Sequence, residues 1–303
     1  MNPAVDKTVE VDKLRPNDLN RISKVEYDAG GKGINVSKTL CAMGCSSLAM
    51  GFLGGNAGKT IENVLTLWDI PHDFIWVEGE TRTNTKVYAF DGGVTELNEP
   101  GPAVSKMELE LLLTKILAHT NEHTLVVLSG SIPAGIDTGI YAEITKRVHE
   151  KGGSVLMDAD GPLFKKALTA SPDMIKPNHK ELEEFVGAEK PLTQGELKAI
   201  AADLQKDGIH TTAVSMGAEG ALFMKGDYAV RCPALKVEAH STVGAGDAMV
   251  AALAYAWEHQ LSEEDMVRLC MAASAGAVTT IGTKPPSRDQ IESLIPQVMI
   301  HKI

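Results

Sequence analysis

The sequence predicts an α/β fold with a mostly parallel central sheet, helices on both faces of that sheet and a small β-sheet lid. Beyond residue 106, apolar strand-like runs alternate with helical segments, which is typical of a parallel sheet covered on both faces. Before residue 100, half-polar strand-like segments at 9–27 and 86–97 contain no intervening helix, which favours a separate small sheet. We therefore expect one domain over residues 1–303, with the lid formed by insertions at about 7–28 and 85–98.

The first hundred residues are expected to contain short strands and two helices. Apolar residues at helical spacing predict a helix at 34–43, and the following Gly44 ends it. A second helix is expected at 58–68, and Asp91-Gly92-Gly93 predicts a hairpin turn. The strands are expected at 9–11, 24–27, 47–53, 73–77, 85–90 and 94–97.

The remainder of the chain is expected to alternate between strands and helices. An alanine-rich helix is expected to follow the loop at 241–247. The other helices are expected at 106–118, 138–150, 162–168, 179–186, 194–206, 263–279 and 288–298. The strands are expected at 124–128, 154–157, 174–175, 211–215, 220–224 and 228–232.

Composition limits the function classes. The net charge of −11, from 29 basic and 40 acidic residues, argues against a nucleic-acid or membrane partner. The four cysteines (Cys41, Cys45, Cys232 and Cys270) form no CxxC pair and no cluster with histidines, which indicates reduced thiols and no structural zinc. No signal peptide or apolar run of membrane-spanning length is present. We therefore expect a cytoplasmic globular protein.

The most informative stretch is Ser-Thr-Val-Gly-Ala-Gly-Asp at residues 241–247. The first turn of a helix has backbone N–H groups without helical partners and lies at the positive end of the helix dipole. Small residues there let a phosphoryl group approach those donors, and Asp247 could take a proton from an attacking hydroxyl. The alternative is a tight turn in which Asp247 only caps a helix.

A rival phosphate loop is Gly-Gly-Asn-Ala-Gly-Lys-Thr at residues 54–60, which follows a strand and opens a helix. A P-loop needs glycine where this chain has Leu53, so the loop is one residue short. The apolar run that ends at Asp158 could imitate the magnesium-binding partner of such a loop. The spacing favours a plain glycine-rich connection.

A third glycine-rich stretch, Gly31-Lys32-Gly33, contains only part of a dinucleotide-binding pattern because the third glycine is missing. A lysine between glycines can reach an anion, and Asn35 at the start of a helix can bond sugar hydroxyls. These residues indicate a sugar or an anion as the ligand.

Four motifs together resemble the PfkB (ribokinase-like) carbohydrate kinases. Residues 29–44, with Gly-Gly-Lys-Gly-Ile-Asn-Val-Ser, resemble the first family signature, and residues 241–247 resemble the second. Lys-Pro-Asn-His-Lys-Glu at 176–181 resembles the Asn-x-x-Glu element, and Ser-Met-Gly-Ala-Glu-Gly at 215–220 resembles the nucleotide loop. The motifs occur in the family's order over the whole chain.

Other stretches resemble the 1-phosphofructokinase and tagatose-6-phosphate kinase branch. They are Asn-Pro-Ala-Val-Asp at 2–6, Thr-Arg-Thr-Asn at 81–84 and Ser-Gly-Ser-Ile-Pro at 129–133. A kinase for a phosphorylated sugar must hold the phosphate that its substrate already carries, and Lys32 and Arg82 can supply the charge. The alternative for Arg82 is a solvated loop cation.

The resemblance implies that the protein transfers the γ-phosphoryl group of ATP to a ketohexose phosphate, with fructose 1-phosphate preferred and tagatose 6-phosphate second. Fructose 6-phosphate and a nucleoside rank lower. The catalytic residues would be Asp247 as the base, with Gly244, Ala245 and Gly246. The substrate-binding residues would be Asp6, Gly30, Gly31, Lys32, Asn35, Arg82, Ser129 and Gly130. ATP would be bound by Lys176, Asn178, Ser215, Gly217, Gly220 and Gly246, and Mg²⁺ by Glu181 through water.

Several alternatives remain open at this stage. Glu181 could be an exposed helix carboxylate instead of a magnesium ligand. A non-catalytic sugar- or nucleotide-binding module would not need Asp247, and a P-loop NTPase would need the loop at 54–60. The edge strands of the lid could pair between subunits, which would give a homodimer.

One departure from the family concerns the amino terminus. Members usually begin with a short apolar strand before the Asn-Pro-x-x-Asp segment, whereas here a single methionine precedes Asn2. Loss of a central strand would leave backbone groups of its neighbours unpaired. We expect either that the given sequence lacks the natural amino terminus or that another segment fills that position.

Overall fold

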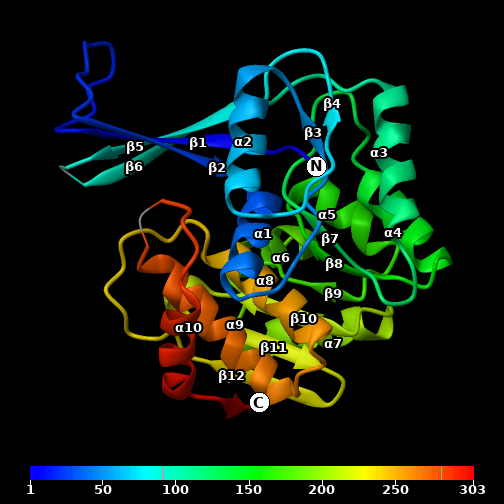
Figure 1. Cartoon of the computed structure of the whole chain (residues 1–303). Helices are drawn as coiled ribbons and strands as arrows, with labels where there is room; N and C mark the ends of the chain where they lie inside the picture. Colours follow the sequence, from blue (N-terminus) through cyan, green and yellow to red (C-terminus); the bar gives the residue numbers. More distant parts are fainter. Residues whose placement is uncertain (91, 281) are drawn as a thin grey trace.

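The main sheet of this computed structural model, which describes residues 1–90, 92–280 and 282–303, has seven strands in the order β13-β12-β11-β10-β9-β8-β7. Strands β7 to β10 are parallel because helices connect them, whereas β11 to β13 add antiparallel pairs. The predicted α/β class is confirmed (Figure 1). The predicted turn at Asp91 lies outside the described residues. The strands are β7 (Leu125–Ser129), β8 (Ser154–Asp158), β9 (Met174–Ile175), β10 (Thr211–Ser215), β11 (Ala221–Lys225), β12 (Tyr228–Cys232) and β13 (His301–Lys302).

Helices cover both faces of this sheet, as predicted. Alternate residues of β8 show why: Leu156 packs in the core under α8 and α9, whereas Val155 and Met157 pack against the helices of the opposite face. The helices are α1 (Lys32–Ala42), α2 (Gly55–Leu67), α3 (Lys106–Ala118), α4 (Ile140–Glu150), α5 (Gly161–Leu168), α6 (His179–Val186), α7 (Gln194–Lys206), α8 (Ala245–Glu258), α9 (Glu263–Val278) and α10 (Arg288–Leu294). Short 3-10 turns lie at Gly217–Glu219 and Ile295–Gln297.

Helix α8 is the central element of the body. It packs against α9 and α1 and also contacts β7 and β8. Its small side chains are buried along most of its length, and Val250 and Leu253 are fully buried. Because alanines let neighbouring helices approach closely, the helix and its first turn are held firmly.

A second sheet of four strands, which we call the projecting sheet, extends away from the body (Figure 1). Its order is β2-β1-β5-β6, with β1 parallel to β5 and the other pairs antiparallel. The strands are β1 (Ala4–Val11), β2 (Lys24–Gly30), β5 (Arg82–Ala89) and β6 (Gly93–Asn98). Strands β1 and β5 start earlier than expected, because their first residues pair with each other where the sheet joins the body.

The expected strands at 47–53 and 73–77 are shorter than predicted. Only β3 (Phe52–Leu53) and β4 (Ile75–Trp76) form, as a separate two-stranded sheet, with an isolated bridge between Ala49 and His72. The central sheet is therefore divided, since β7 ends the seven-stranded sheet and β3 lies in another.

The amino terminus lies beside this division. The Phe52 N–H donates to the Met1 carbonyl at 3.3 Å, so the chain begins beside β3. Within the described residues, no segment pairs with the free edge of β7. A cavity is lined by residues 47–50 on one side and 125–128 on the other.

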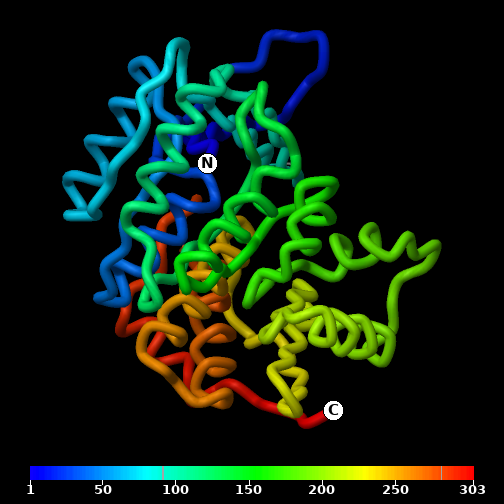
Figure 2. The backbone as a smooth tube through the Cα atoms, turned by 90° about the vertical axis from the view of Figure 1, so that its right-hand side faces the viewer, coloured from blue at the N-terminus to red at the C-terminus, as the bar shows by residue number. Residues whose placement is uncertain are grey.

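The amino terminus lies among other segments in the upper half of the molecule, whereas the carboxyl terminus lies at its lower edge (Figure 2). The amino terminus is next to β3, and the carboxyl-terminal β13 pairs with β12. Among the described residues, no helix is both long and apolar enough to cross a bilayer.

Candidate active site

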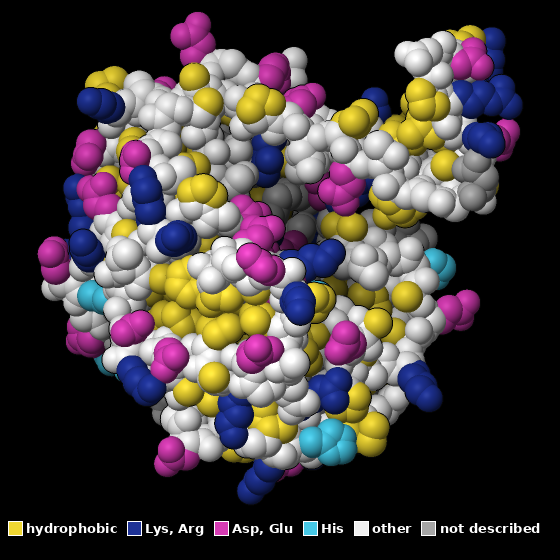
Figure 3. Space-filling view, turned by 180° about the vertical axis from the view of Figure 1, so that it is seen from behind, with side chains coloured by type: hydrophobic (Ala, Val, Ile, Leu, Met, Phe, Trp, Pro, Cys, Tyr) yellow, Lys and Arg dark blue, Asp and Glu magenta, His cyan; other side chains and the backbone are white. Residues whose placement is uncertain are grey.

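The cavity beside β7, about 1520 Å³ in all, runs from residues 47–50 and 125–128 to the space between the projecting sheet and the carboxyl ends of the parallel strands (Figure 3). Ligands of open α/β sheets bind at this edge. The cavity brings together every site residue predicted from the sequence except Gly30. Those that line it are Asp6, Gly31, Lys32, Asn35, Arg82, Ser129, Gly130, Lys176, Asn178, Glu181, Ser215, Gly217, Gly220, Gly244, Ala245, Gly246 and Asp247.

The first turn of α8 opens into this cavity. Gly244 precedes the helix with φ of 86°, a conformation that favours glycine, and no side chain caps the helix there. Asp247 belongs to the same turn and is only 7% exposed. Its Oδ2 accepts a hydrogen bond of 2.8 Å from the Asn35 side chain. The turn therefore offers backbone donors and a carboxylate side by side.

Burial and the nearby carboxylate of Asp158 raise the pKa of Asp247 to about 6. The Asn35 hydrogen bond and the ammonium groups of Lys32 and Lys176 oppose this shift. A general base is most effective when its pKa lies close to the working pH. The environment of Asp247 is therefore suited to proton transfer near neutrality.

A buried charge cluster lies next to this turn. The Lys32 Nζ is 3.2 Å from both oxygens of Asp158, and the Lys176 Nζ is 3.3 Å from Oδ1. A Cβ at Gly246 would lie 3.3 Å from the Lys176 Nζ, which places that ammonium beside the first turn of α8. Lys32 was predicted to bind the sugar phosphate and Lys176 to bind ATP. Both contact the same carboxylate, that of Asp158.

Asp158 is a site residue that the sequence reasoning missed, since it considered this residue only as a partner for a P-loop. The side chain is 1% exposed and stands at the carboxyl end of β8. Burial would raise the pKa of Asp158, but Lys176 and Lys32 hold it below its ordinary value. Burial would likewise lower the pKa of Lys32, and the carboxylates of Asp158, Glu181 and Asp247 together raise it instead. Its place at the end of a buried strand was the signal that could have revealed it.

The predicted nucleotide residues form one edge of the cavity. Asn178 and Glu181 make a capping box at the start of α6, in which each side chain accepts the other's backbone N–H at 2.9 and 2.8 Å. Asn178 also forms a parallel bridge with Ser215, which leads into the turn that contains Gly217. The capping role explains the placement of Asn178 and Glu181, and their roles toward ATP and Mg²⁺ stay predictions.

The residues present fit a magnesium ion bound mainly through water and phosphate. No group of three or more His, Cys, Asp and Glu side chains in the described ranges could enclose a metal. Mg²⁺ keeps several waters and needs only one or two protein carboxylates. Glu181 lines the cavity, and burial raises its pKa, so a nearby cation would be favourable there.

The predicted sugar residues come from the projecting sheet and from α1. Asp6 of β1 is buried, and a Cβ at Gly30 would lie 2.3 Å from its Oδ2. Gly30 therefore makes room for Asp6 without lining the cavity itself. Arg82, at the start of β5, is held by a bond of 3.2 Å from its Nε to the Asn2 carbonyl. Arg82 is thus a fixed cavity residue, not a solvated loop cation.

Several buried polar atoms around the cavity have no hydrogen-bond partner within the described part of the chain. They are Asn35 Oδ1, Ser47 Oγ, Asn84 Oδ1, Ser129 Oγ and His179 Nδ1, together with Asp158 Oδ2, which has only the ion pair with Lys32. Buried polar atoms are normally bonded, so a cluster of unbonded ones at a cavity indicates where a polar ligand binds. Ser129 and Gly130 are also positioned by Tyr141, whose hydroxyl proton is shared between their carbonyls at 3.2 and 3.0 Å.

The rival loop at 54–60 is not an anion site. The backbone N–H groups of Asn56 and Ala57, at the start of α2, each donate to the Glu80 carboxylate at 3.1 Å. The Gly54 N–H donates to the Thr81 hydroxyl at 2.8 Å. A side chain of the protein therefore occupies the donors that a phosphate would need.

Comparison with known proteins identifies the family of this chain. The sequence pattern of the pfkB family carbohydrate kinase matches residues 1–290. The chain belongs to the pfkB family of carbohydrate kinases. A 1-phosphofructokinase of Borreliella burgdorferi is 34% identical to this pfkB-family chain and covers 100% of it and 97% of its own length. A tagatose-6-phosphate kinase of Staphylococcus epidermidis is 31% identical and covers 100% and 98%.

A solved structure gives the same fold. Phosphofructokinase-2 from Escherichia coli, in complex with substrates and products, superposes on this pfkB-family chain with a TM-score of 0.93 at 26% identity. The match covers 98% of this chain and 97% of the other. The predicted ribokinase-like fold and family membership are confirmed.

Proposed function

We propose that this kinase transfers the γ-phosphoryl group of ATP to the 6-hydroxyl of fructose 1-phosphate and releases fructose 1,6-bisphosphate and ADP. The observation that carries the proposal is the buried Asp247 carboxylate at the uncapped first turn of α8, next to Lys32 and Lys176. A binding module has no use for a buried carboxylate with a raised pKa at an anion site. A P-loop NTPase is excluded by Glu80 at the other loop.

The geometry supports a direct transfer. Asp247 accepts the proton of the 6-hydroxyl, whose oxygen forms the new bond to the γ-phosphorus while the bond to the ADP oxygen breaks. The backbone N–H groups of Gly244, Ala245 and Gly246 face the oxygens that gain charge. Lys176 and Lys32 add positive charge on the same side of the loop. Preorganised donors of this kind supply most of the catalysis in phosphoryl transfer.

Magnesium belongs to the proposal through Glu181. When bound with ATP, the ion neutralises charge on the phosphates. Glu181 would hold it through water, from its capping position at the start of α6. Asn178, Ser215 and Gly217 would bind the nucleotide at the same edge of the cavity.

The substrate choice rests on the relatives and on charge. The relatives include both 1-phosphofructokinases and tagatose-6-phosphate kinases, so tagatose 6-phosphate is the second candidate. An arginine fixed at the sugar side favours a sugar that already carries a phosphate, since Arg binds phosphate oxygens in pairs. A free sugar would not need Arg82.

An ADP-release assay tests the proposal. Fructose 1-phosphate, tagatose 6-phosphate, fructose 6-phosphate and free fructose are compared at equal concentrations with saturating ATP and Mg²⁺. We expect kcat/KM to be highest for fructose 1-phosphate, by at least about tenfold. A higher value for tagatose 6-phosphate would reassign the substrate, and turnover with free fructose alone would reject a phosphosugar kinase.

The projecting sheet is proposed to act as a lid and as a dimer contact of this single-domain chain. Its face opposite the cavity carries the exposed apolar side chains of Val25, Tyr27 and Leu97. Exposed apolar residues grouped on one face mark an interaction surface. Another structure of the E. coli relative is described as its tetrameric inhibited form, so its subunits do assemble.

Sedimentation measures the proposed assembly. We expect the wild type to sediment as a dimer and Val25→Glu to sediment as a monomer with an unchanged melting temperature, because Val25 is already exposed. A wild type of monomer mass would contradict the proposal. We also propose a cytoplasmic location, supported by the four free cysteine thiols.

A further inference from the structure

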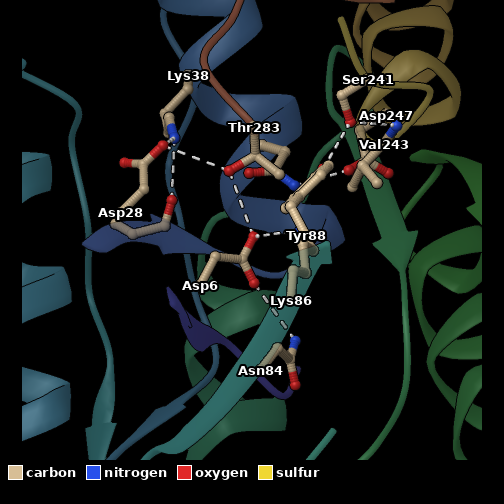
Figure 4. Close-up of polar contacts among 12 residues, drawn as sticks. Asp6, Asp28, Lys38, Asn84, Lys86, Tyr88, Ser241, Val243, Asp247 and Thr283 are labelled. Carbon is tan, nitrogen blue, oxygen red and sulfur yellow. Dashed lines mark hydrogen bonds and ion pairs between the residues drawn. The ribbon is translucent and has the colours of Figure 1, made fainter. Parts of the chain in front are cut away.

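Lys86 lies on the face of the projecting sheet that lines the cavity. Arg82, Asn84 and Lys86 are alternate residues of β5 and therefore share one face. Asn84 stands opposite Asp6 of β1, and all of them line the cavity. Figure 4 shows Asn84 and Lys86 grouped around Asp6, apart from Asp247. Lys86 was not among the residues singled out from the sequence.

Lys86 is buried but weakly bonded. Lys86 is 5% exposed, and its Nζ lies 3.4 Å from the Asp6 Oδ2. Charge-assisted bonds of this kind are normally about 2.7–2.9 Å long, and an ammonium has three N–H donors to place. The neighbouring Asn84 Oδ1 has no partner among the described residues, and the Asn84 Nδ2 is 3.5 Å from Asp6. The Lys86 ammonium therefore has donors for ligand oxygens, whereas the Asn84 Oδ1 can only accept a bond from a ligand hydroxyl.

The surroundings of Lys86 are otherwise acidic. Glu96 of β6 pairs with it across the sheet. A second cavity of about 280 Å³ on the other side of Lys86 is lined by Asp6, Glu26 and Asp28, with Lys284 as its other cation. A phosphate placed here without Lys86 would have only Arg82 on this face of β5 to offset several carboxylates, so the lysine favours a dianion.

Two other lysines of the cavity are already paired with a carboxylate. Lys32 and Lys176 both contact Asp158, beside the first turn of α8. In a ketohexose 1-phosphate whose 6-hydroxyl meets Asp247, the phosphate is at the opposite end of the sugar. Asp6, which contacts Lys86, is a predicted substrate-binding residue.

We propose that Lys86, together with Arg82, binds the phosphate that the substrate already carries and thereby selects phosphorylated over free ketohexoses. The inference rests on the proposed function, which it deepens by naming the residue that sets the substrate class. The contact is a charge-assisted bond between the Lys86 ammonium and phosphate oxygens, and it leaves the transfer step at Asp247 unchanged.

Steady-state kinetics of Lys86→Met, which keeps the chain length and removes the charge, test this role. We expect KM for fructose 1-phosphate to rise about 10- to 100-fold, the usual effect of losing a charged hydrogen bond, while kcat falls less than about threefold. The kcat/KM for free fructose should change less than about threefold. Lys86→Arg should restore KM to within about fivefold. The control is Lys24→Met, because Lys24 pairs with Glu26 at 2.7 Å in the same sheet and lines neither cavity.

The outcomes separate this inference from the proposed function. If the wild type phosphorylates fructose 1-phosphate and Lys86→Met leaves its KM unchanged, the inference is wrong and the proposed function stands. Equal losses with fructose 1-phosphate and free fructose would show that Lys86 only supports Asp6, and would also overturn it. If the melting temperature of Lys86→Met is more than about 10 °C below that of the wild type, Lys86→Gln is measured in its place. The Gln side chain can still bond Asp6, and the same criteria apply. A wild type without turnover on any ketohexose phosphate overturns both.

Discussion

Replacing Asp247 with Asn is expected to lower kcat about 100- to 10,000-fold while the Kd for ATP changes less than about threefold. The amide keeps the size of the side chain and can still bond Asn35, which now donates to Asp247 at 2.8 Å. It cannot accept the proton of the attacking hydroxyl. Stopped-flow or coupled assays give kcat, and calorimetry gives the ATP affinity. A variant that retains more than about a tenth of the wild-type kcat would remove Asp247 as the base.

The same residue predicts a pH dependence. Burial raises the pKa of Asp247 to about 6, so the carboxylate becomes protonated and inactive as the pH falls through that value. We expect kcat/KM of the wild type to fall about tenfold for each pH unit below 6. The residual kcat/KM of Asp247→Asn should not show this fall below pH 6.

Asp247→Asn should lower activity but raise the stability of the folded state at pH 7. A carboxyl group whose pKa is raised on folding binds more protons in the folded state between its unfolded value of 3.8 and about 6. Its effect is therefore increasingly destabilising as the pH rises through this window. At pH 7 we expect Asp247→Asn to unfold at a higher temperature than the wild type, by an amount equivalent to about 2–3 kcal/mol. Below pH 4 the difference should vanish.

Replacing Asp158 with Asn is expected to be the most destabilising change near the site. It leaves the buried ammonium of Lys176 and the half-buried ammonium of Lys32 without the carboxylate that both contact. Breaking a buried ion pair from one side costs about 3–5 kcal/mol. Denaturant unfolding at pH 7 measures the loss. Asp203→Asn, which breaks the exposed ion pair with Lys206, is the control and should leave the midpoint unchanged.

The effect of Asp158 has its own pH signature. Lys176 and Lys32 hold the pKa of Asp158 below its unfolded value of 3.8, so its stabilisation is present above that value and is lost as the pH falls below it. The wild type and Asp158→Asn should therefore converge in stability in acid. A variant as stable as the wild type at pH 7 would show that the two lysines do not depend on this carboxylate.

The sequence predicted an element well where the residues that determine its start lie within the same short segment. Helices α3 and α7 start where expected because Ser105 with Glu108, and Thr193 with Glu196, form capping boxes. The expected strand at 47–53 is wrong for most of its length, because only Phe52–Leu53 pair with β4 and β7 is not joined to this segment. Pairing depends on distant segments that a local pattern does not contain.

The site shows the same limit. Glycine loops and Asp247 are visible in the sequence because their chemistry is local. Asp158 joins Lys32 across 126 positions, and Lys86 joins Asp6 across 80, so only the fold brings them together. Glu80 excludes the rival loop in the same way, by meeting Asn56 from a separate segment. Charge partners at long sequence separation are thus what sequence reasoning missed.

Phosphorus NMR of the product tests the central claim most directly. The protein is incubated with fructose 1-phosphate, ATP and Mg²⁺, and the sugar product is examined for the position of its second phosphate. The account predicts fructose 1,6-bisphosphate, formed in equal amount to ADP by the wild type and absent within the same time with Asp247→Asn. ADP formed without a bisphosphate, or equal product from the variant, would contradict it.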